Sequence, residues 1–328
     1  MRSVTPIALG YNSLYLVEDH GERILVDAGP DFETAWETLS EALGARRPDG
    51  VAITHAHLDH AGLGAQWLRA GVPVALGAAD VHLAEAPSLA NGAEWDVMTG
   101  FVRGSGAPSE VASAAIEGLH QRREWARHAA TDARYRPAGR DSRWPTGLRY
   151  EPFHGVEGLE DGRYAGAGLR VVECPGHTPG NVVLVHETEG WLFSGDQLLP
   201  LITPTPAIQV HIAGEQPARF RSLPAFAASL RRLQAMQFER CYPGHGEPFE
   251  NVRGVIDANL SQIEQRGERV MELVRARPRS AYEVADALYP RALARRFWQI
   301  IATVQGQLDI LEDTGRVGRD GANWSPAG

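Results

Sequence analysis

Residues 54–60 read T-H-A-H-L-D-H and directly follow an apolar stretch, V-A-I. Imidazole nitrogens and carboxylate oxygens are the usual ligands of zinc and related divalent metals. A strand that stops at a sharp turn can aim alternate side chains at one point, because successive side chains of extended chain point to opposite sides. We therefore expect His55 and His57 to face one metal, and Asp59 and His60, one step on, to face a second.

Three further motifs place metal-ligating residue types after apolar runs. They are His177 in C-P-G-H-T-P-G, Asp196 in F-S-G-D and His245 in Y-P-G-H-G. The apolar runs before them cover residues 169–172, 191–193 and 238–242. Each residue is thus expected where a strand ends. Together with the first motif, five histidines and two carboxylates predict a site for two metals.

With these motifs the sequence resembles the metallo-β-lactamase-fold hydrolase superfamily over roughly the first 250 residues, including N-S-L-Y-L at 12–16 and V-D-A-G at 26–29. The resemblance implies an α/β fold, a four-layer αββα sandwich of two mixed sheets with helices outside. It assigns the ligands as follows: one metal to His55, His57 and His177, a second to Asp59, His60 and His245, with Asp196 bridging the pair. The superfamily includes β-lactamases, thioesterases such as glyoxalase II, lactonases, nucleases and sulfur dioxygenases, so the fold alone does not give the substrate.

Length and composition limit the class of protein. A chain of 328 residues can hold one large domain and a smaller one. No run of about 18 apolar residues is present, and the N-terminus lacks the apolar segment of a signal peptide. Two cysteines, Cys174 and Cys241, do not form a disulfide framework. We expect a cytoplasmic protein without a membrane segment, and a net charge of −9 argues against general nucleic-acid binding.

The order of periodic segments alternates between strands and helices in the first domain, residues 1–250. Such strand–helix–strand units imply sheets covered by helices. We expect strands at about 5–17, 23–27, 51–54 and 72–76, and helices at 33–44 and 61–70.

Residues about 80–150 form an insertion with a basic, aromatic composition. From Arg103 to Arg149 it has nine arginines against five acidic residues, although the chain as a whole is acidic. One interpretation is a wall beside the active site that offers guanidinium groups and rings to an anionic substrate. The alternative is a solvated helical hairpin whose aromatic residues pack onto the domain. The candidate substrate contacts are Arg122, Arg123 and Trp125 in the insertion, with Tyr11 and His211 at the rim.

Residues 251–328 are expected to form a small second domain. Amphipathic stretches at about 255–277, 280–288 and 293–311 predict helices, and the last residues predict a short β-hairpin. This order resembles a winged-helix module. Winged helices often bind DNA, but eleven arginines against ten acidic residues leave this segment close to neutral. Packing or homodimerisation is therefore the preferred prediction.

The chemistry expected of the site follows from its ligands. Two divalent cations, zinc first with iron or manganese as alternatives, would lower the pKa of a shared water so that hydroxide attacks a carbonyl. Asp59 would orient this nucleophile. Asp196 argues against a typical β-lactamase, since the resembling lactam-cleaving enzymes generally lack this bridging aspartate. Asp27 is expected to hold the ligand loops by hydrogen bonds, and Asn181 to donate to a loop or to substrate.

Hydrolysis of a thioester or related ester is the preferred function, because a thiolate leaves without needing a proton. The substrate would be a small molecule or a carrier-bound acyl group. A lactonase, or a hydrolase of other small esters and amides, is the second hypothesis. A phosphodiesterase or nuclease would require a basic track. A mononuclear iron sulfur dioxygenase is a fourth hypothesis and would hold a single iron.

Overall fold

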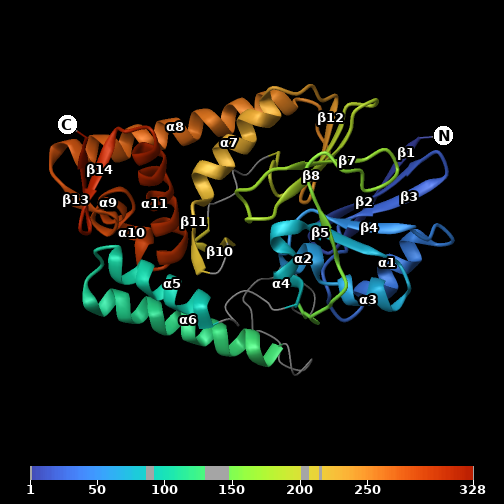
Figure 1. Cartoon of the computed structure of the whole chain (residues 1–328), viewed down its shortest axis with the longest axis horizontal. Helices are drawn as coiled ribbons and strands as arrows, with labels where there is room; N and C mark the ends of the chain where they lie inside the picture. The colour runs from blue at the N-terminus through green and yellow to red at the C-terminus, as the bar shows by residue number, and fades with distance from the viewer. Residues whose placement is uncertain (1, 86–91, 130–147, 201–206, 214–215, 328) are drawn as a thin grey trace.

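The molecule is elongated, with the N-terminal sheets at one end and the C-terminal helices at the other in a computed structural model of the chain (Figure 1). The structure describes residues 2–85, 92–129, 148–200, 207–213 and 216–327. Within these ranges, no helix combines the length and the apolar character needed to cross a membrane.

The first sheet has six strands in the order β1-β2-β3-β4-β5-β6. Its first three strands are antiparallel, and β3 to β6 are parallel neighbours. The strands are β1 (Ser3–Leu9), β2 (Asn12–Asp19), β3 (Glu22–Val26), β4 (Gly50–Ile53), β5 (Val74–Gly77) and β6 (Glu157–Leu159). The single strand expected at about 5–17 is wrong. Gly10, with a φ of 63°, turns the chain tightly between β1 and β2, a conformation that glycine adopts without strain.

The second sheet has four strands in the order β12-β9-β8-β7. The strands are β7 (Arg170–Glu173), β8 (Val182–His186), β9 (Trp191–Gly195) and β12 (Arg240–Pro243). β12 runs parallel to β9, so the residues after both strands leave the sheet at the same edge. Asp196 and His245 follow these two strands, as the apolar runs in the sequence predicted.

Three buried cores separate four layers. Between the sheets, Tyr15 and Val26 pack with Leu184, Phe193 and Tyr242. A second core joins the other face of the first sheet to α1 (Ala35–Leu43), α2 (Leu58–Ala61) and α3 (Gly64–Arg69). A third joins the second sheet to α7 (Ser222–Gln234) and the first half of α8 (Val252–Ala276). The predicted four-layer αββα sandwich is confirmed.

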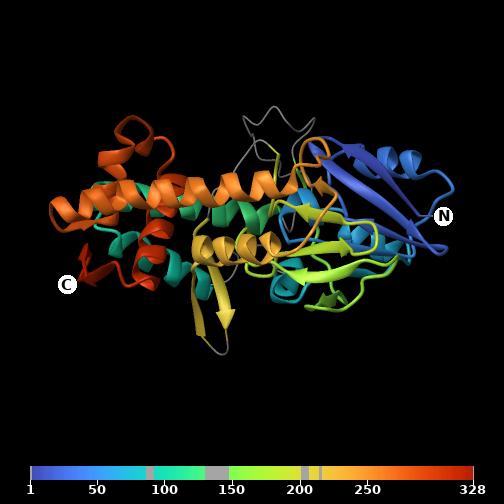
Figure 2. The same cartoon turned by 90° about the horizontal axis from the view of Figure 1, so that it is seen from above.

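The C-terminal residues form a helical unit with a small sheet. Figure 2 shows α8 running from the second sheet out to this unit. Its other elements are β13 (Arg279–Ser280), α9 (Ala281–Leu288), α10 (Pro290–Leu293), α11 (Phe297–Asp313), β14 (Val317–Asp320) and β15 (Asn323–Pro326). The expected C-terminal hairpin is β14–β15, in a sheet of order β13-β15-β14. The helix expected from residue 293 begins at Phe297, after the short α10. The winged-helix assignment stays a prediction.

The described helices of the insertion pack on the C-terminal unit. The described elements near and within residues 80–150 are η1 (Ala78–Asp80), α4 (Val81–Glu85), α5 (Gly92–Gly104) and α6 (Ser109–Ala129). Phe101 of α5 joins the C-terminal core, and the backbone N–H of Tyr282 donates to the carbonyl of Ser105 at 2.9 Å. Both views show α5 and α6 beside the C-terminal helices (Figures 1 and 2). This packing was not predicted from the sequence.

A hairpin, β10 (Gln209–Ala213) with β11 (Gln216–Phe220), connects the two ends of the molecule. Arg219 of β11 donates from Nη1 and Nη2 to the two carboxylate oxygens of Asp309 in α11, each at 2.7 Å. Its guanidinium also lies 5.8 Å from the ring centroid of Phe101 in α5. Asp309 is buried, and Gln305 donates to the same carboxylate. One side chain of the hairpin, Arg219, thus contacts both neighbouring segments.

We expect Asp309→Ala to lower the free energy of unfolding by about 3–5 kcal/mol, because it leaves the largely buried guanidinium of Arg219 without its partner. Asp257→Ala is the control, since Asp257 pairs with Arg253 on the exposed surface of α8 and should cost about 0.5 kcal/mol or less. Urea unfolding of the two variants and the parent measures both values. Equal losses in the two variants would show that the Arg219 pair does not hold the hairpin.

Candidate metal centre

The first motif turns sharply between β4 and α2. The chain bends at Thr54 as it leaves β4, and His57, extended with φ −67° and ψ 146°, stands directly before α2. His55 and His57 therefore lie two residues apart, before the helix begins. Asp59 and His60 are consecutive residues in the four-residue helix α2. This change from strand to helix within seven residues explains why one short motif supplies two separate groups of side chains.

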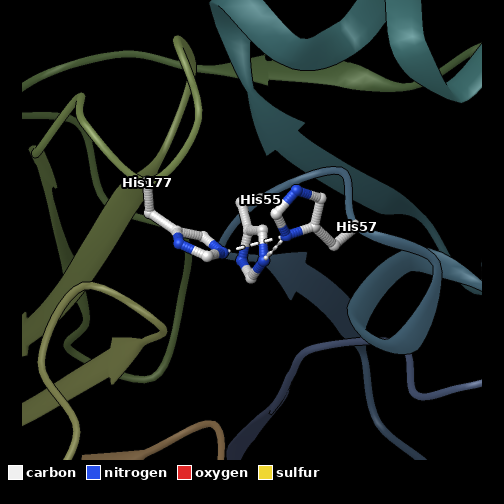
Figure 3. A group of neighbouring side chains, drawn as sticks. All are labelled: His55, His57 and His177. Atoms are coloured by element: carbon white, nitrogen blue, oxygen red, sulfur yellow. Dashed lines mark hydrogen bonds between the residues drawn. The ribbon is translucent and has the colours of Figure 1, made fainter. Parts of the chain in front are cut away.

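His55, His57 and His177 bring three ring nitrogens together (Figure 3). His57 Nδ1 lies 3.0 Å from His55 Nε2 and 2.9 Å from His177 Nε2. A single N–H on His57 can donate to only one of these two nitrogens. A cation at the centre would accept all three lone pairs, as in a zinc site with histidine ligands. The three side chains therefore fit a divalent metal better than a hydrogen-bonded cluster.

Asp59, His60 and His245 form a second group whose potential ligand atoms all lie within 4.8 Å of one another. Asp59 Oδ2 is 3.3 Å from His245 Nε2 and 3.7 Å from His60 Nε2. One carboxylate and two imidazoles are again a donor set suited to zinc, iron or manganese.

Asp196 lies between the two groups. Its Oδ1 is 3.4 Å from both His60 Nε2 and His245 Nε2, and its Oδ2 is 3.5 Å from His177 Nε2. Gly195, before it, has a φ of 49°, and a Cβ there would lie 2.4 Å from Thr54 Oγ1. The carboxylate thus reaches the centre only because glycine lets the end of β9 approach the end of β4.

Asp27 supports both halves of the first motif. Its Oδ1 accepts from the backbone N–H of Thr54 at 2.7 Å and from the Thr54 hydroxyl at 2.9 Å, and its Oδ2 accepts from His60 Nδ1 at 2.8 Å. Since the Thr54 hydroxyl proton goes to Asp27, Thr54 Oγ1 accepts from His55 Nδ1 at 3.1 Å. His245 Nδ1 donates to the carbonyl of Tyr11 at 3.1 Å. In all three histidines, Nδ1 has its partner away from the centre, so Nε2 is the nitrogen available to a metal.

The pKa values of the histidines differ between the groups. Burial lowers the pKa of His177 to about 3, with the neighbouring His57 adding to the shift, and burial with the nearby His60 lowers that of His55 well below its usual value. Burial also lowers the pKa of His60, but Asp27 and Asp196 raise it well above the usual value. Near neutral pH the His55 and His177 rings are neutral, as metal binding requires.

The two carboxylates stay ionised. Burial raises the pKa of Asp59, but the charge of His60 and the hydrogen bond from His245 outweigh it, so the pKa lies below its usual value. Burial acts on Asp196 in the same direction and is likewise outweighed by His60 and His245, which hold its pKa well below the usual range. The two carboxylates would offset two of the four positive charges that a pair of divalent cations would bring.

The remaining predicted residues are less closely joined to the centre. Tyr11 is 40% exposed and its ring stacks on His245, with centroids 4.7 Å apart. Asn181 is buried, and its Nδ2 donates to the carbonyl of Val182 at 3.4 Å. The other candidate substrate contacts are His211 in β10 and, in α6, Arg122, Arg123 and Trp125. The side chains of these four residues lie outside the described part of the structure.

Two further residues lie near the centre, and of these Asp80 was given no role from the sequence. Asn12 Nδ2 is 3.3 Å from His60 Nε2. Asp80 is fully buried and receives hydrogen bonds from two ligand-bearing segments. A signal for Asp80 exists in the sequence, because it stands just beyond a strand parallel and adjacent to β4, and the carboxyl ends of such strands share one edge.

The profile of the metallo-beta-lactamase superfamily matches residues 8–245. This chain belongs to the metallo-beta-lactamase superfamily. The prediction of a hydrolytic enzyme from this superfamily is thereby confirmed.

Relatives of known sequence and structure agree with this assignment. A probable metallo-hydrolase, YqjP of Bacillus subtilis (strain 168), is 29% identical over 325 residues, which cover 95% of this chain and 91% of the relative. An atrochrysone carboxyl ACP thioesterase, AgnL7 of Paecilomyces divaricatus, is 32% identical over 123 residues, covering 37% of this chain and 35% of the relative. The crystal structure of the metallo-beta-lactamase family protein TTHA1429 from Thermus thermophilus covers 99% of this chain and 98% of its own, with a TM-score of 0.69 and 24% identity. This last likeness is one of fold.

We expect Gly195→Ala to destabilise the protein by about 1–3 kcal/mol more than Gly315→Ala does. Both residues have a positive φ, 49° and 66°, so both variants place a methyl group on left-handed backbone. Only the first methyl meets a neighbour, at 2.4 Å from Thr54 Oγ1, and such overpacking costs about 1–3 kcal/mol. Chemical unfolding of both variants measures the difference. Equal destabilisation would mean that the approach of β9 to Thr54 is not tight.

Proposed function

We propose that this chain is a dinuclear metal-dependent hydrolase that cleaves a thioester or related ester of an anionic acyl substrate. The observation that carries the proposal is the position of Asp196. Its two oxygens face opposite groups of three ligands, 3.4 Å from His245 Nε2 on one side and 3.5 Å from His177 Nε2 on the other. A carboxylate so placed suits two metals rather than one.

The seven side chains divide naturally between two ions. His55, His57 and His177 would hold the first, Asp59, His60 and His245 the second, and Asp196 both. Two bound divalent cations, zinc first with iron or manganese as alternatives, would supply an acidified water as nucleophile and a Lewis acid for the oxyanion.

Asp59 is the residue to which we assign a catalytic role. Its side chain is 23% exposed, against 12% for Asp196, so it is the ligand carboxylate that faces the open side of the centre. Ionised at neutral pH, it can accept a hydrogen bond from the attacking water and fix its direction toward the substrate carbonyl.

The choice of a thioester follows from what the site offers the leaving group. The five histidines each present a nitrogen to one of the two groups, and the chain contains no lysine. Among the described residues, no side chain of these types is therefore free at the centre to protonate a leaving group. A thiolate leaves without protonation, whereas an amine or alkoxide does not. The named ACP thioesterase relative, over the part that it shares with this chain, supports the same choice.

The arginines of the insertion support an anionic substrate. Nine arginines against five acidic residues between Arg103 and Arg149 form a basic segment on an acidic chain. The substrate is a small molecule or an acyl group on a carrier. Tyr11, exposed beside His245, is the described side chain best placed to border it, with Arg122, Arg123, Trp125 and His211 as further proposed contacts.

Asp59→Asn keeps the size of the side chain and removes its charge. We expect kcat on an acyl thioester to fall by about 10²-fold or more, as for the loss of one preorganised catalytic group. Asp161→Asn, in the half-exposed ion pair with Arg232, should retain the parent rate. Steady-state kinetics with elemental analysis of both variants gives the comparison. A near-parent kcat for Asp59→Asn would rule out the role of Asp59.

A substrate panel with metal analysis tests the function as a whole. We expect about two zinc ions per chain, and faster turnover of acyl-pantetheine thioesters than of a lactone, an oxygen ester or a phosphodiester. Faster lactone cleavage would replace the thioesterase proposal by the lactonase. Cleavage of the phosphodiester alone would indicate the nuclease class. One iron per chain with oxygen consumption on a persulfide would identify a sulfur dioxygenase.

A further inference from the structure

We propose that Asp80 is a positioning residue that fixes the His177 loop against the His55–His57 segment, and so sets the geometry of the first metal site. The proposal rests on the proposed metal-dependent function. Asp80 lies outside the seven ligands, in the short helix η1 that follows β5. Among the described contacts, Asp80 touches no side chain of a metal ligand. It acts through the backbone segments that carry the ligands.

The carboxylate of Asp80 receives three hydrogen bonds from two segments. Its Oδ2 accepts from the backbone N–H of Ala56 at 3.1 Å and from the hydroxyl of Thr178 at 2.6 Å. Its Oδ1 accepts from the backbone N–H of Gly180 at 2.6 Å. Ala56 stands between His55 and His57, and Thr178 directly follows His177. One buried side chain therefore connects the backbones of all three ligands of the first site.

These two segments come from different sheets, so their relative position depends on contacts between the sheets. The His55–His57 segment follows β4 of the first sheet, whereas the His177 loop joins β7 to β8 of the second. Metal–ligand distances must hold to about 0.2 Å. The backbone N–H of Val182 donates to the carbonyl of Thr54 at 2.9 Å, which joins the two segments where they leave their sheets. The hydrogen bonds to the Asp80 carboxylate, short and directional, act closer to the ligands, at Ala56, Thr178 and Gly180.

The surroundings of Asp80 leave it no freedom to move. Its side chain is fully buried. A Cβ at Gly180 would lie 2.3 Å from the backbone nitrogen of Asp80, and a Cβ at Gly77 would lie 1.7 Å from the carbonyl oxygen of Gly180. The backbone of η1 thus packs directly on the His177 loop. An ionised carboxylate in this space is stable only while its donors stay in place, because an unpaired buried charge is costly.

Asp80→Asn is the variant that tests this role. The amide has the same shape, but its nitrogen cannot accept a hydrogen bond and would face a donor, so at least one of the three bonds is lost. We expect the affinity of one zinc ion to fall by about 10–100-fold, the usual effect of removing a hydrogen-bond partner behind a metal ligand. Chelator competition on the full-length protein measures the affinity of each ion, and elemental analysis at limiting zinc should show one ion retained.

Asp19→Asn is the matched control. Asp19 is also a buried carboxylate, with Arg2 and His186 as partners, at the edge of the sheets opposite the metal ligands. It should lower the unfolding temperature of the metal-free protein while leaving both zinc affinities unchanged. If Asp80→Asn behaves like Asp19→Asn, with reduced stability and unchanged zinc affinity, Asp80 is merely structural and the proposal is overturned.

Thr178→Val gives a milder test should Asp80→Asn fail to fold. It removes one of the three hydrogen bonds and should weaken the same zinc ion by a smaller factor, while Thr178→Ser should restore the parent affinity. Equal affinity in Thr178→Val and Thr178→Ser would overturn the proposal. A parent protein that binds no zinc would instead overturn the proposed function and this inference with it, whereas a parent with two ions and an unaffected Asp80→Asn would overturn this inference alone.

Discussion

The hydrogen bonds of Asp27 are the interaction on which the ligand set depends. One carboxylate fixes Thr54, where β4 ends, and His60, in α2, so the sharp turn between them has a constant shape. The Thr54 hydroxyl donates to Asp27 and is then obliged to accept from His55. The choice of which ring nitrogen carries the proton is therefore made outside the centre. Asp27 itself has a φ of 64°, a left-handed conformation that aspartate tolerates better than most residues.

The same principle explains why so many polar side chains are buried together. His55 and His60 are fully buried, and Asp196 is 8% exposed. Removing such groups from water is costly unless each finds a partner. Away from the centre, Asp27, Thr54 and the carbonyl of Tyr11 supply those partners. Toward the centre, Asp196 Oδ1 is buried and has no hydrogen-bond donor. Bound cations would supply the partner that this oxygen lacks.

The sequence predicted the features that depend on neighbouring residues. The motif at 54–60, the apolar runs before the other ligands and the helical periodicity of α8 are local patterns, and the structure has the corresponding elements. The turn at Gly10 was missed because apolar residues continue on both sides of it. Asp80 was missed for a different reason. Its place just after the strand expected at 72–76 was a signal, but its partners Thr178 and Gly180 lie 98 and 100 residues further along the chain, so no local pattern encodes the contact itself.

The sequence also suggested separate roles for the insertion and the C-terminal residues, whereas the structure joins them at the β10–β11 hairpin. Gln209, where β10 begins, donates to the carbonyl of His177 at 2.5 Å. Arg219, on the paired strand, binds Asp309 of α11 and lies over Phe101 of α5. A shift of either helix would move Arg219, and through the ladder between the two strands it would move Gln209. The backbone of one ligand is thus connected to residues that follow the last ligand in the chain, so the C-terminal unit belongs to the framework of the site as well as to its own core.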